Sequence, residues 1–390
     1  MAGLDNGKRI LKGFFVLMVL ISFTVTALVG GLFFTNYENI GQLFQVAALI
    51  KSEFLWPAET GKLIEGAIEG MVNSLGDEYS VYMNAEKFQE LQSHIQGAFG
   101  GIGIYVGVRE KKITVIAPIE GTPGARAGIK AGDVIAKING KHTEDMDIDE
   151  AVSIMKGEPG TKVKLSIARP GLEKLLEFTI TREIINVPTV EGQILKENPD
   201  IAYIRIAMFA SNTDEAFAKE MEELLQKGFK ALIIDLRDNP GGDLDTVVNI
   251  ARYFVPEGPI VHIVNNDNKT ETRFATGNII KVPVTVLING GSASASEILA
   301  GAIKDTGVGT LIGTKTFGKG IVQSIYFLNQ GAGLKLTTAK YLTPNKNDIH
   351  QKGISPDIEI ELPEYIPGQK ELPRDTQKLK AIEVLEGKIK

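Results

Sequence analysis

The strongest constraint on the fold of this 390-residue chain is an alternation of strand-like and helix-like segments after Val187. The strand-like runs are Ile201–Phe209, Ala231–Leu236 and Val282–Ile288. The segments with helical spacing of apolar residues are expected to begin near Thr213, Asp245 and Ser294. Such βα alternation is typical of a layered α/β domain.

Residues 97–185 have a different pattern, in which apolar and polar residues alternate as in half-buried strands. The alternation occurs at 102–106, 163–167 and 176–180. A short helix is expected to begin near Asp147 or Asp149 and to stop at Gly157. The pattern predicts a small α+β domain inserted before the α/β domain.

Near the N-terminus, no charged residue interrupts the run from Gly13 to Phe34. As a helix this run would rise ~33 Å, enough for a bilayer core of ~30 Å. A cleaved signal peptide is the alternative, but its apolar region is usually only ~7–15 residues long. We therefore expect residues 13–34 to form a transmembrane anchor.

Basic residues in segment 1–12 set the expected orientation of this anchor. Lys8, Arg9 and Lys12 precede the apolar run, against one acidic residue, Asp5. A basic flank favours the cytoplasmic side. The chain after Tyr37 is thus expected outside the cytoplasm, on a single-pass protein of the cell membrane.

The rest of the chain divides by its pattern into three further segments. Residues 38–96 show helical spacing and are expected to form a helical N-terminal segment, with packing or dimerisation as its role. Residues 186–362 hold the α/β domain. Residues 363–390 form a tail that ends in a helix from about Thr376 to Leu385, expected to serve docking or formation of a homodimer.

Composition argues against several classes of function. The formal net charge of −6, without a long basic block, gives no general attraction for nucleic acid. There are no cysteines, and the four histidines form no His-Glu-x-x-His pattern. No metal site and no cofactor are expected.

A candidate nucleophile lies where the strand Val282–Ile288 meets the following helix. The junction holds Ser292, Ser294 and Ser296. A hydroxyl at a helix N-terminus faces free backbone N–H groups and the positive end of the helix dipole, which suits acyl transfer. A plain helix cap by serine explains the same residues. The junction is not the Gly-x-Ser-x-Gly elbow, because serines occupy both glycine positions.

A serine nucleophile needs a base, and no histidine lies in a suitable pattern; His262, in a strand-like run, is expected to be structural. Lysine is the other solution, if burial moves its pKa from ~10.4 to ~7.5, at a cost of ~4 kcal/mol. Lys319 lies between Gly318 and Gly320, and Phe317 could remove solvent from its amine. A solvent-exposed turn lysine remains open.

The segment 313–320 also approaches a phosphate-binding loop, Gly-x-x-x-x-Gly-Lys-Ser/Thr. Gly320 replaces the hydroxyl residue, however, and a strand, not a helix, is expected next. A second glycine pair, Gly241 and Gly242, could aim an N–H group at an oxyanion, with the N–H of Ala295 as the other donor. An ordinary glycine-rich turn is the equal alternative there.

Taken together, these segments resemble the carboxy-terminal processing peptidases, or tail-specific proteases, over nearly the whole chain. The motifs are Asp-Leu-Arg-x-Asn-Pro-Gly-Gly at 235–242, Gly-Ser-Ala-Ser-Ala-Ser-Glu-Ile at 291–298, Thr-Phe-Gly-Lys-Gly-Ile-Val-Gln at 316–323, Lys-Leu-Thr-Thr-Ala-Lys-Tyr-Leu-Thr-Pro at 335–344 and Gly-Ile-Ser-Pro-Asp at 353–357. The resemblance implies that Ser294 is the nucleophile and Lys319 the general base, and that Gln323 orients the lysine amine. It also implies a crotonase-like or ClpP-like catalytic layer.

The resemblance further implies that residues 97–185 are a PDZ domain. Its carboxylate-binding loop would be Gly100, Gly101, Ile102, Gly103 and Ile104. Backbone N–H groups of such a loop bind a terminal carboxylate while the peptide adds a strand to the sheet. One departure is the glycine of Pro123-Gly124-Ala125, where relatives more often have Pro-Ala.

The sequence thus predicts a serine endopeptidase that cleaves extracytoplasmic proteins near or from exposed C-termini. A membrane-tethered PDZ adaptor without catalysis is the main alternative, and a nucleotide-binding protein is the third.

Overall fold

The computed structural model describes residues 18–20, 22–24, 40–144, 146–277, 279–363 and 374–389. The chain forms two units, Met1–Glu78 and Tyr79–Lys390. Most of the expected membrane span, 13–34, lies outside the described residues; its described parts, 18–20 and 22–24, are helical. Within the described part of the chain, no helix has the length and apolar character needed to cross a membrane.

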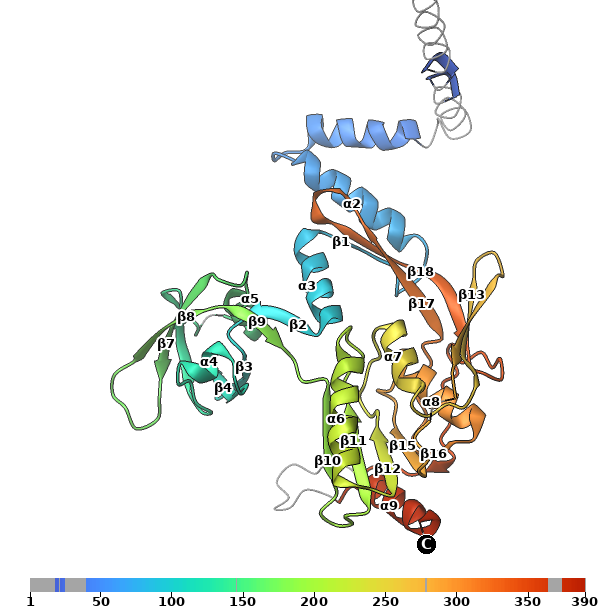
Figure 1. Cartoon of the computed structure of the whole chain (residues 1–390). Helices are drawn as coiled ribbons and strands as arrows, with labels where there is room; N and C mark the ends of the chain where they lie inside the picture. The colour runs from blue at the N-terminus through green and yellow to red at the C-terminus, as the bar shows by residue number, and fades with distance from the viewer. Residues whose placement is uncertain are drawn as a thin grey trace, which may run out of the picture. The chain divides into compact units, whose positions relative to one another are not determined.

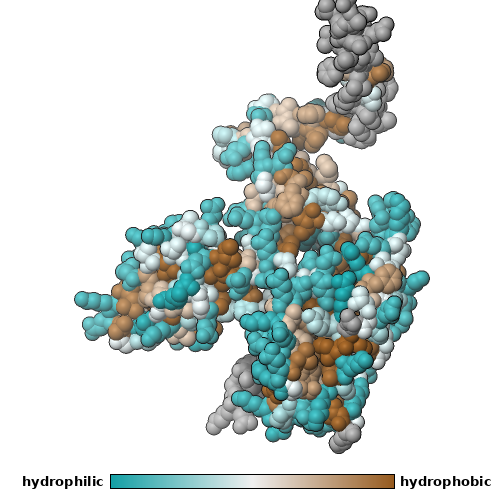
Figure 2. Space-filling view, in the orientation of Figure 1, coloured by the Kyte–Doolittle hydropathy of each residue, from teal (hydrophilic) through white to brown (hydrophobic). Residues whose placement is uncertain are grey.

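The N-terminal unit contains a helix over residues 40–53 and helix α2 (Thr60–Asn73), and Gly76 follows α2 with a positive φ of 65°. Large apolar side chains are exposed on these helices and on the residues around them (Figure 2). They are Leu43, Phe44, Val46, Leu49, Phe54, Leu55, Trp56, Ile64, Met71 and Leu75. The helical spacing predicted for this region is therefore present, but its apolar residues stay largely uncovered.

The larger unit is built on a six-stranded sheet with the order β10-β11-β12-β15-β16-β19 (Figure 1). The strands are β10 (Val190–Ile194), β11 (Ile201–Ile206), β12 (Ala231–Asp235), β15 (Val284–Ile288), β16 (Gly309–Gly313) and β19 (Ile358–Glu359). All neighbours are parallel except β10 and β11. Every residue of β12 and β15 is buried, because both faces of the sheet are covered.

Three helices follow β11, β12 and β15 in turn, as the alternation predicted. They are α6 (Thr213–Lys227), α7 (Leu244–Ala251) and α8 (Ala295–Thr306). Their apolar side chains share one core with residues of the sheet such as Ile204, Ile234 and Val286. The first nine residues of α8 are all buried, so this helix lies inside the domain and not on its surface.

A second, antiparallel sheet joins distant segments of the same unit. Its strands are β1 (Val81–Met83), β13 (Gly258–Asn265), β14 (Thr270–Ala275), β17 (Ile321–Phe327) and β18 (Gly333–Leu342). A 3-10 turn, η1 (Asn329–Gly331), links the last two strands. The expectation that segment 38–96 is entirely helical is wrong, because it contains strand β1. Helix α3 (Ala85–Gln96) follows this strand and belongs to the same unit. A strand of three residues is too short to show a periodic pattern of apolar residues. It is identified by its pairing with β18.

Residues 98–186 form the expected small domain. Its strands are β2 (Ala98–Gly101), β3 (Ile104–Arg109), β4 (Lys112–Pro118), β5 (Val134–Ile138), β6 (Lys141–His142), β7 (Lys162–Ala168), β8 (Leu176–Thr181) and β9 (Glu183–Asn186). The helices are α4 (Pro123–Arg126) and α5 (Ile148–Met155). Helix α5 begins where the sequence predicted, because the Asp147 side chain accepts a hydrogen bond of 2.7 Å from the Glu150 N–H.

Helix α9 (Thr376–Lys388) covers the other face of the central sheet (Figure 1). Its residues Ala381, Ile382 and Leu385 are buried against strand residues that include Ile233 and Leu287. The apolar face of this helix thus docks on the sheet of its own unit, and a role in a homodimer stays a prediction. The sequence pattern showed an amphipathic helix but could not show which surface the helix covers.

An ion-pair network holds α9 in place. The Arg237 guanidinium donates hydrogen bonds to Asp235 (2.9 Å) and Asp375 (2.8 Å), and Tyr203 donates to Asp235 (2.7 Å). Burial lowers the pKa of Arg237, but its hydrogen bonds to the two carboxylates outweigh this effect and raise it. Burial raises the pKa of Asp375, but the hydrogen bonds from Arg237 and from the Lys378 N–H, together with the charges of both residues, outweigh that effect and lower it below 3.8.

This network predicts an acid-dependent loss of stability. Because folding lowers the pKa of Asp375, its contribution is fully present above the ordinary pKa of 3.8 and is lost as the pH falls through the lower folded value. The melting temperature of Asp375→Asn should lie below that of wild type at about pH 6, and the gap should close below 3.8. Asp200→Asn, which removes an exposed ion pair with Lys230, is the control and should change little. A gap that persists in acid would contradict this role.

Candidate active site

Three loops meet at the carboxyl edge of the central sheet. They leave β12, β15 and β16 in the same direction, because these strands are parallel. The loops are residues 236–243, 289–294 and 314–320. They contain the glycine pair, the serine junction and the lysine that the sequence singled out. Ligands of open parallel sheets bind at this edge.

Ser294 occupies a strained position between β15 and α8. Its φ is 53° and its ψ is −114°, a region that residues with a Cβ atom rarely adopt. The next residue, Ala295, is the first of α8, so its N–H has no acceptor within the helix. The Ser294 side chain is therefore presented beside an unsatisfied backbone donor.

The two flanking serines have structural roles. The Ser292 hydroxyl donates to the Leu236 carbonyl (2.7 Å), and the Ser296 hydroxyl donates to the Asn239 carbonyl (2.9 Å). Both side chains are fully buried, whereas Ser294 is partly exposed. Of the three serines, Ser294 is the one that a substrate can reach.

Glu297, which the sequence reasoning missed, connects the serine to the lysine loop. One carboxylate oxygen, Oε2, accepts hydrogen bonds from the backbone N–H of Ser294 (2.9 Å) and of Lys319 (2.8 Å). The other, Oε1, accepts from the Thr316 hydroxyl (2.6 Å) and the Gly318 N–H (2.8 Å). Glu297 is fully buried. The backbone nitrogens of Ser294 and Lys319 therefore lie within two hydrogen-bond lengths of each other.

Tyr341 bridges the same two residues through their carbonyl groups. Its hydroxyl lies 2.9 Å from the carbonyl oxygen of Ser294 and 2.6 Å from that of Lys319. Burial and the nearby Glu297 carboxylate raise the pKa of Tyr341 well above 10.0, so the phenol stays a donor at neutral pH. The sequence analysis identified segment 335–344 only as a motif. Tyr341 is the residue of this motif that contacts the candidate site.

The Lys319 side chain is partly buried, and its amine lies 5.0 Å from the centre of the Tyr79 ring. Phe317, the residue expected to remove solvent from this amine, is 57% exposed, so Tyr79 is the aromatic residue that the structure places near it. The glycine at 320 permits a close approach, because a Cβ there would lie 2.7 Å from the backbone nitrogen of His350. Strand β17 follows directly, which removes the helix N-terminus that a phosphate-binding loop requires.

Gln323 lies on β17, opposite Thr337 of β18. Its Nε2 atom is buried and has no hydrogen-bond partner in the described part of the chain. His262 of β13, by contrast, has a hydrogen-bond partner for each ring nitrogen. Its Nδ1 lies 2.8 Å from the Thr272 hydroxyl and its Nε2 lies 3.2 Å from the Pro344 carbonyl, so its role is structural, as predicted.

The glycine pair lies against the serine junction. A Cβ on Gly241 would come within 2.7 Å of the Ser294 Cβ and 2.8 Å of the Ala295 nitrogen. The Gly241 N–H is already bound by the Asn239 side chain (2.9 Å). The Gly242 N–H has no hydrogen bond to another described residue, so Gly242 and Ala295 are the N–H groups left for a ligand.

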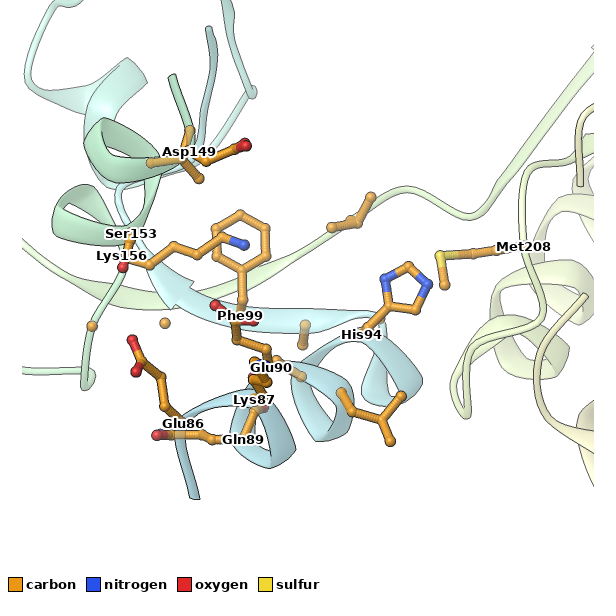
Figure 3. Close-up of a pocket in the computed structure, with 18 residues that line it drawn as sticks. Glu86, Lys87, Gln89, Glu90, His94, Phe99, Asp149, Ser153, Lys156 and Met208 are labelled. Atoms are coloured by element: carbon orange, nitrogen blue, oxygen red, sulfur yellow. The ribbon is translucent and has the colours of Figure 1, made fainter. Parts of the chain in front are cut away.

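The small domain carries a hollow at the expected carboxylate loop. The hollow is lined by residues 101–104 and by Val152, Met155 and Lys156 from α5 and its C-terminal end. A larger cleft beside it is bordered by α3 and α5, and there the Lys156 amine lies 5.1 Å from the centre of the Phe99 ring (Figure 3). In the described residues no group of three or more His, Asp or Glu side chains could hold a metal ion.

A serine at a helix N-terminus, the N–H of the next residue, and a nearby lysine whose backbone N–H binds the same carboxylate form an arrangement that suits a serine hydrolase. Comparison with known proteins narrows this class. Residues 200–360 match Peptidase family S41, residues 114–169 match the PDZ domain, and residues 32–87 match the Activating protease CtpB N-terminal domain.

Several relatives are similar over most of the chain. Carboxy-terminal processing protease CtpB of Bacillus subtilis is 40% identical over 320 residues, covering 81% of this chain and 67% of that protein. The carboxy-terminal-processing protease of Bartonella bacilliformis is 38% identical over 361 residues, covering 90% and 82%. The solved photosystem II D1 C-terminal processing protease has a TM-score of 0.51 and 29% identity, covering 88% of this chain and 90% of that one. The chain belongs to the carboxy-terminal processing proteases of family S41 and is a serine-type endopeptidase.

The Glu297 contacts predict a large catalytic effect of a small change. In Glu297→Gln one acceptor oxygen becomes an NH2 group, which faces two of the four donors and loses their hydrogen bonds. We expect kcat for a peptide substrate to fall about a hundredfold, because Ser294 and Lys319 lose their common support. Thr316→Val removes one donor and leaves the carboxylate, so its loss should be smaller. Unchanged kcat in Glu297→Gln would refute the role.

The backbone strain at Ser294 predicts a gain in stability when its Cβ is removed. Ser294→Gly should raise the free energy of unfolding by about 1 kcal/mol, since glycine tolerates positive φ. Ser294→Ala keeps the Cβ and should leave it nearly unchanged. Chemical denaturation of both variants measures the difference, and equal stabilities would show that the strain is absent.

Proposed function

We propose that Ser294 is the nucleophile and Lys319 the general base of this endopeptidase. The observation that supports this best is the pair of bridges by Glu297 and Tyr341, which hold the backbones of both residues together. Lys319 takes the proton of the Ser294 hydroxyl as Oγ attacks a peptide carbonyl carbon. The amine then returns a proton to the leaving nitrogen, and water hydrolyses the acyl-enzyme.

The oxyanion of each tetrahedral intermediate would be held at the glycine pair and the start of α8. The Gly242 and Ala295 N–H groups serve as the donors, while Gly241 provides the close approach of its loop to Ser294. Gln323 would orient the Lys319 amine through its amide oxygen.

Substrates are proteins or peptides with an exposed, apolar C-terminus. The loop Gly100–Ile104 would bind the terminal carboxylate, and the last side chain would enter the hollow beside Val152 and Met155. The peptide would add as a strand beside β3. Binding at a chain end explains why the S41 relatives carry the name of carboxy-terminal processing.

The remaining proposals concern location and assembly. Residues 13–34 would anchor the chain in the cell membrane by one span, with the catalytic unit outside the cytoplasm. The exposed apolar side chains of residues 40–75 would be covered in a homodimer. The adaptor without catalysis is not favoured, since the relatives are named as proteases.

Substitutions of the two residues test the mechanism. Ser294→Ala should abolish cleavage of an unfolded protein by the chain while peptide binding remains. Lys319→Ala should be nearly as severe, and Lys319→Arg should not restore activity, because a guanidinium cannot act as a base at working pH. Product analysis by mass spectrometry gives the readout. Cleavage retained by Ser294→Ala would disprove the proposed nucleophile.

A further inference from the structure

Arg182 is a buried cation without a carboxylate partner in the described part of the chain. Arg182 lies between β8 and β9 and is only 8% exposed. The guanidinium donates to the carbonyls of Ile154 (2.8 Å), Met155 (3.1 Å) and Lys162 (3.2 Å), and to the Thr161 hydroxyl (2.9 Å). None of these acceptors carries a formal negative charge, so the full positive charge of Arg182 is at most partly balanced within the described residues.

Two partly buried arginines of the same unit, by contrast, are balanced by carboxylates. Arg169 pairs with the buried Asp133 (2.7 Å), and Arg237 pairs with Asp235 and Asp375. Burying an unpaired charge is costly, and natural folds rarely tolerate it without a reason. The contrast indicates that a counter-charge reaches Arg182 from outside the domain.

The position of Arg182 shows where that counter-charge would bind. The backbone of Gly157 packs on the guanidinium, since a Cβ there would lie 2.9 Å from the Arg182 Nε. The Gly157 N–H donates to the Gly100 carbonyl (3.0 Å), and a side chain on Gly100 would collide with the Gly157 carbonyl oxygen. One residue thus separates the cation from the loop 100–104.

The C-terminus of α5 makes this cation necessary. The carbonyl groups at the end of a helix carry partial negative charge, and those of Ile154 and Met155 end the helix whose residues Val152 and Met155 line the hollow. A carboxylate bound there would be repelled by them. Arg182 binds both carbonyls and leaves net positive charge behind the loop.

We propose that Arg182 supplies the positive potential against which the C-terminal carboxylate of a substrate binds. It acts across the Gly157 backbone without touching the ligand, and is therefore a positioning and specificity residue. The inference rests on the proposed function, in which the loop 100–104 binds a chain end.

The test compares two peptides of the same sequence, one with a free C-terminal carboxylate and one with a C-terminal amide. Binding is measured by calorimetry on the full chain carrying Ser294→Ala, so that no cleavage occurs. Arg182→Gln should lose roughly tenfold in affinity for the acid and little for the amide. Arg182→Lys keeps the charge and should keep the preference for the acid.

Arg126→Gln is the matched control, because Arg126 lies in the same domain but is half exposed in an ion pair with Glu183. It should leave the ratio of the two affinities unchanged. If Arg182→Gln leaves the ratio of the two affinities unchanged, either because both fall by the same factor or because neither falls, the inference is overturned while the proposed function stands. If the Ser294→Ala chain shows no preference for the acid, binding of chain ends itself fails, and the inference fails with it.

Discussion

The active-site edge depends on one buried carboxylate, that of Glu297. A carboxylate inside a protein is tolerated only when hydrogen bonds replace its water, and here four donors do so. Those donors come from the serine junction and from the lysine loop. The carboxylate therefore has its full set of partners only when both segments are in place, so the chemistry of the site and the folding of its loops are coupled.

The support extends outward from this carboxylate in layers. Thr316, which donates to Glu297, also accepts a hydrogen bond of 2.7 Å from the Ile354 N–H, and its own N–H donates to the Ile354 carbonyl (3.1 Å). Tyr341 adds a bridge from strand β18 on the carbonyl side of Ser294 and Lys319. Four sequence motifs between residues 291 and 357 thus act as one scaffold. Their spacing in the sequence gives no hint of this common centre.

The sequence predicted the secondary-structure elements whose own residues show a pattern of burial. The buried strands β12 and β15 and the helices that follow them were located to within a few residues, since their apolar patterns are long and regular. Strand β1 was missed because three residues are too few to show a periodic pattern. The pattern of α9 predicted an amphipathic helix but did not identify the sheet face that it covers. Glu297 was passed over within its own motif, since a glutamate near a helix start looks like an ordinary cap until its partners are seen.

Helix α9 has a consequence for the order of events during synthesis. Helices α6, α7 and α8 cover one face of the sheet, but its other face stays apolar and open until residues 376–388 cover it. These residues follow every loop of the active site in the chain. Since a ribosome makes the chain from its N-terminus, the last layer of the catalytic domain is delivered late. A chain that stops before residue 376 would therefore leave one face of its central sheet uncovered, although all the loops of the candidate site had been made.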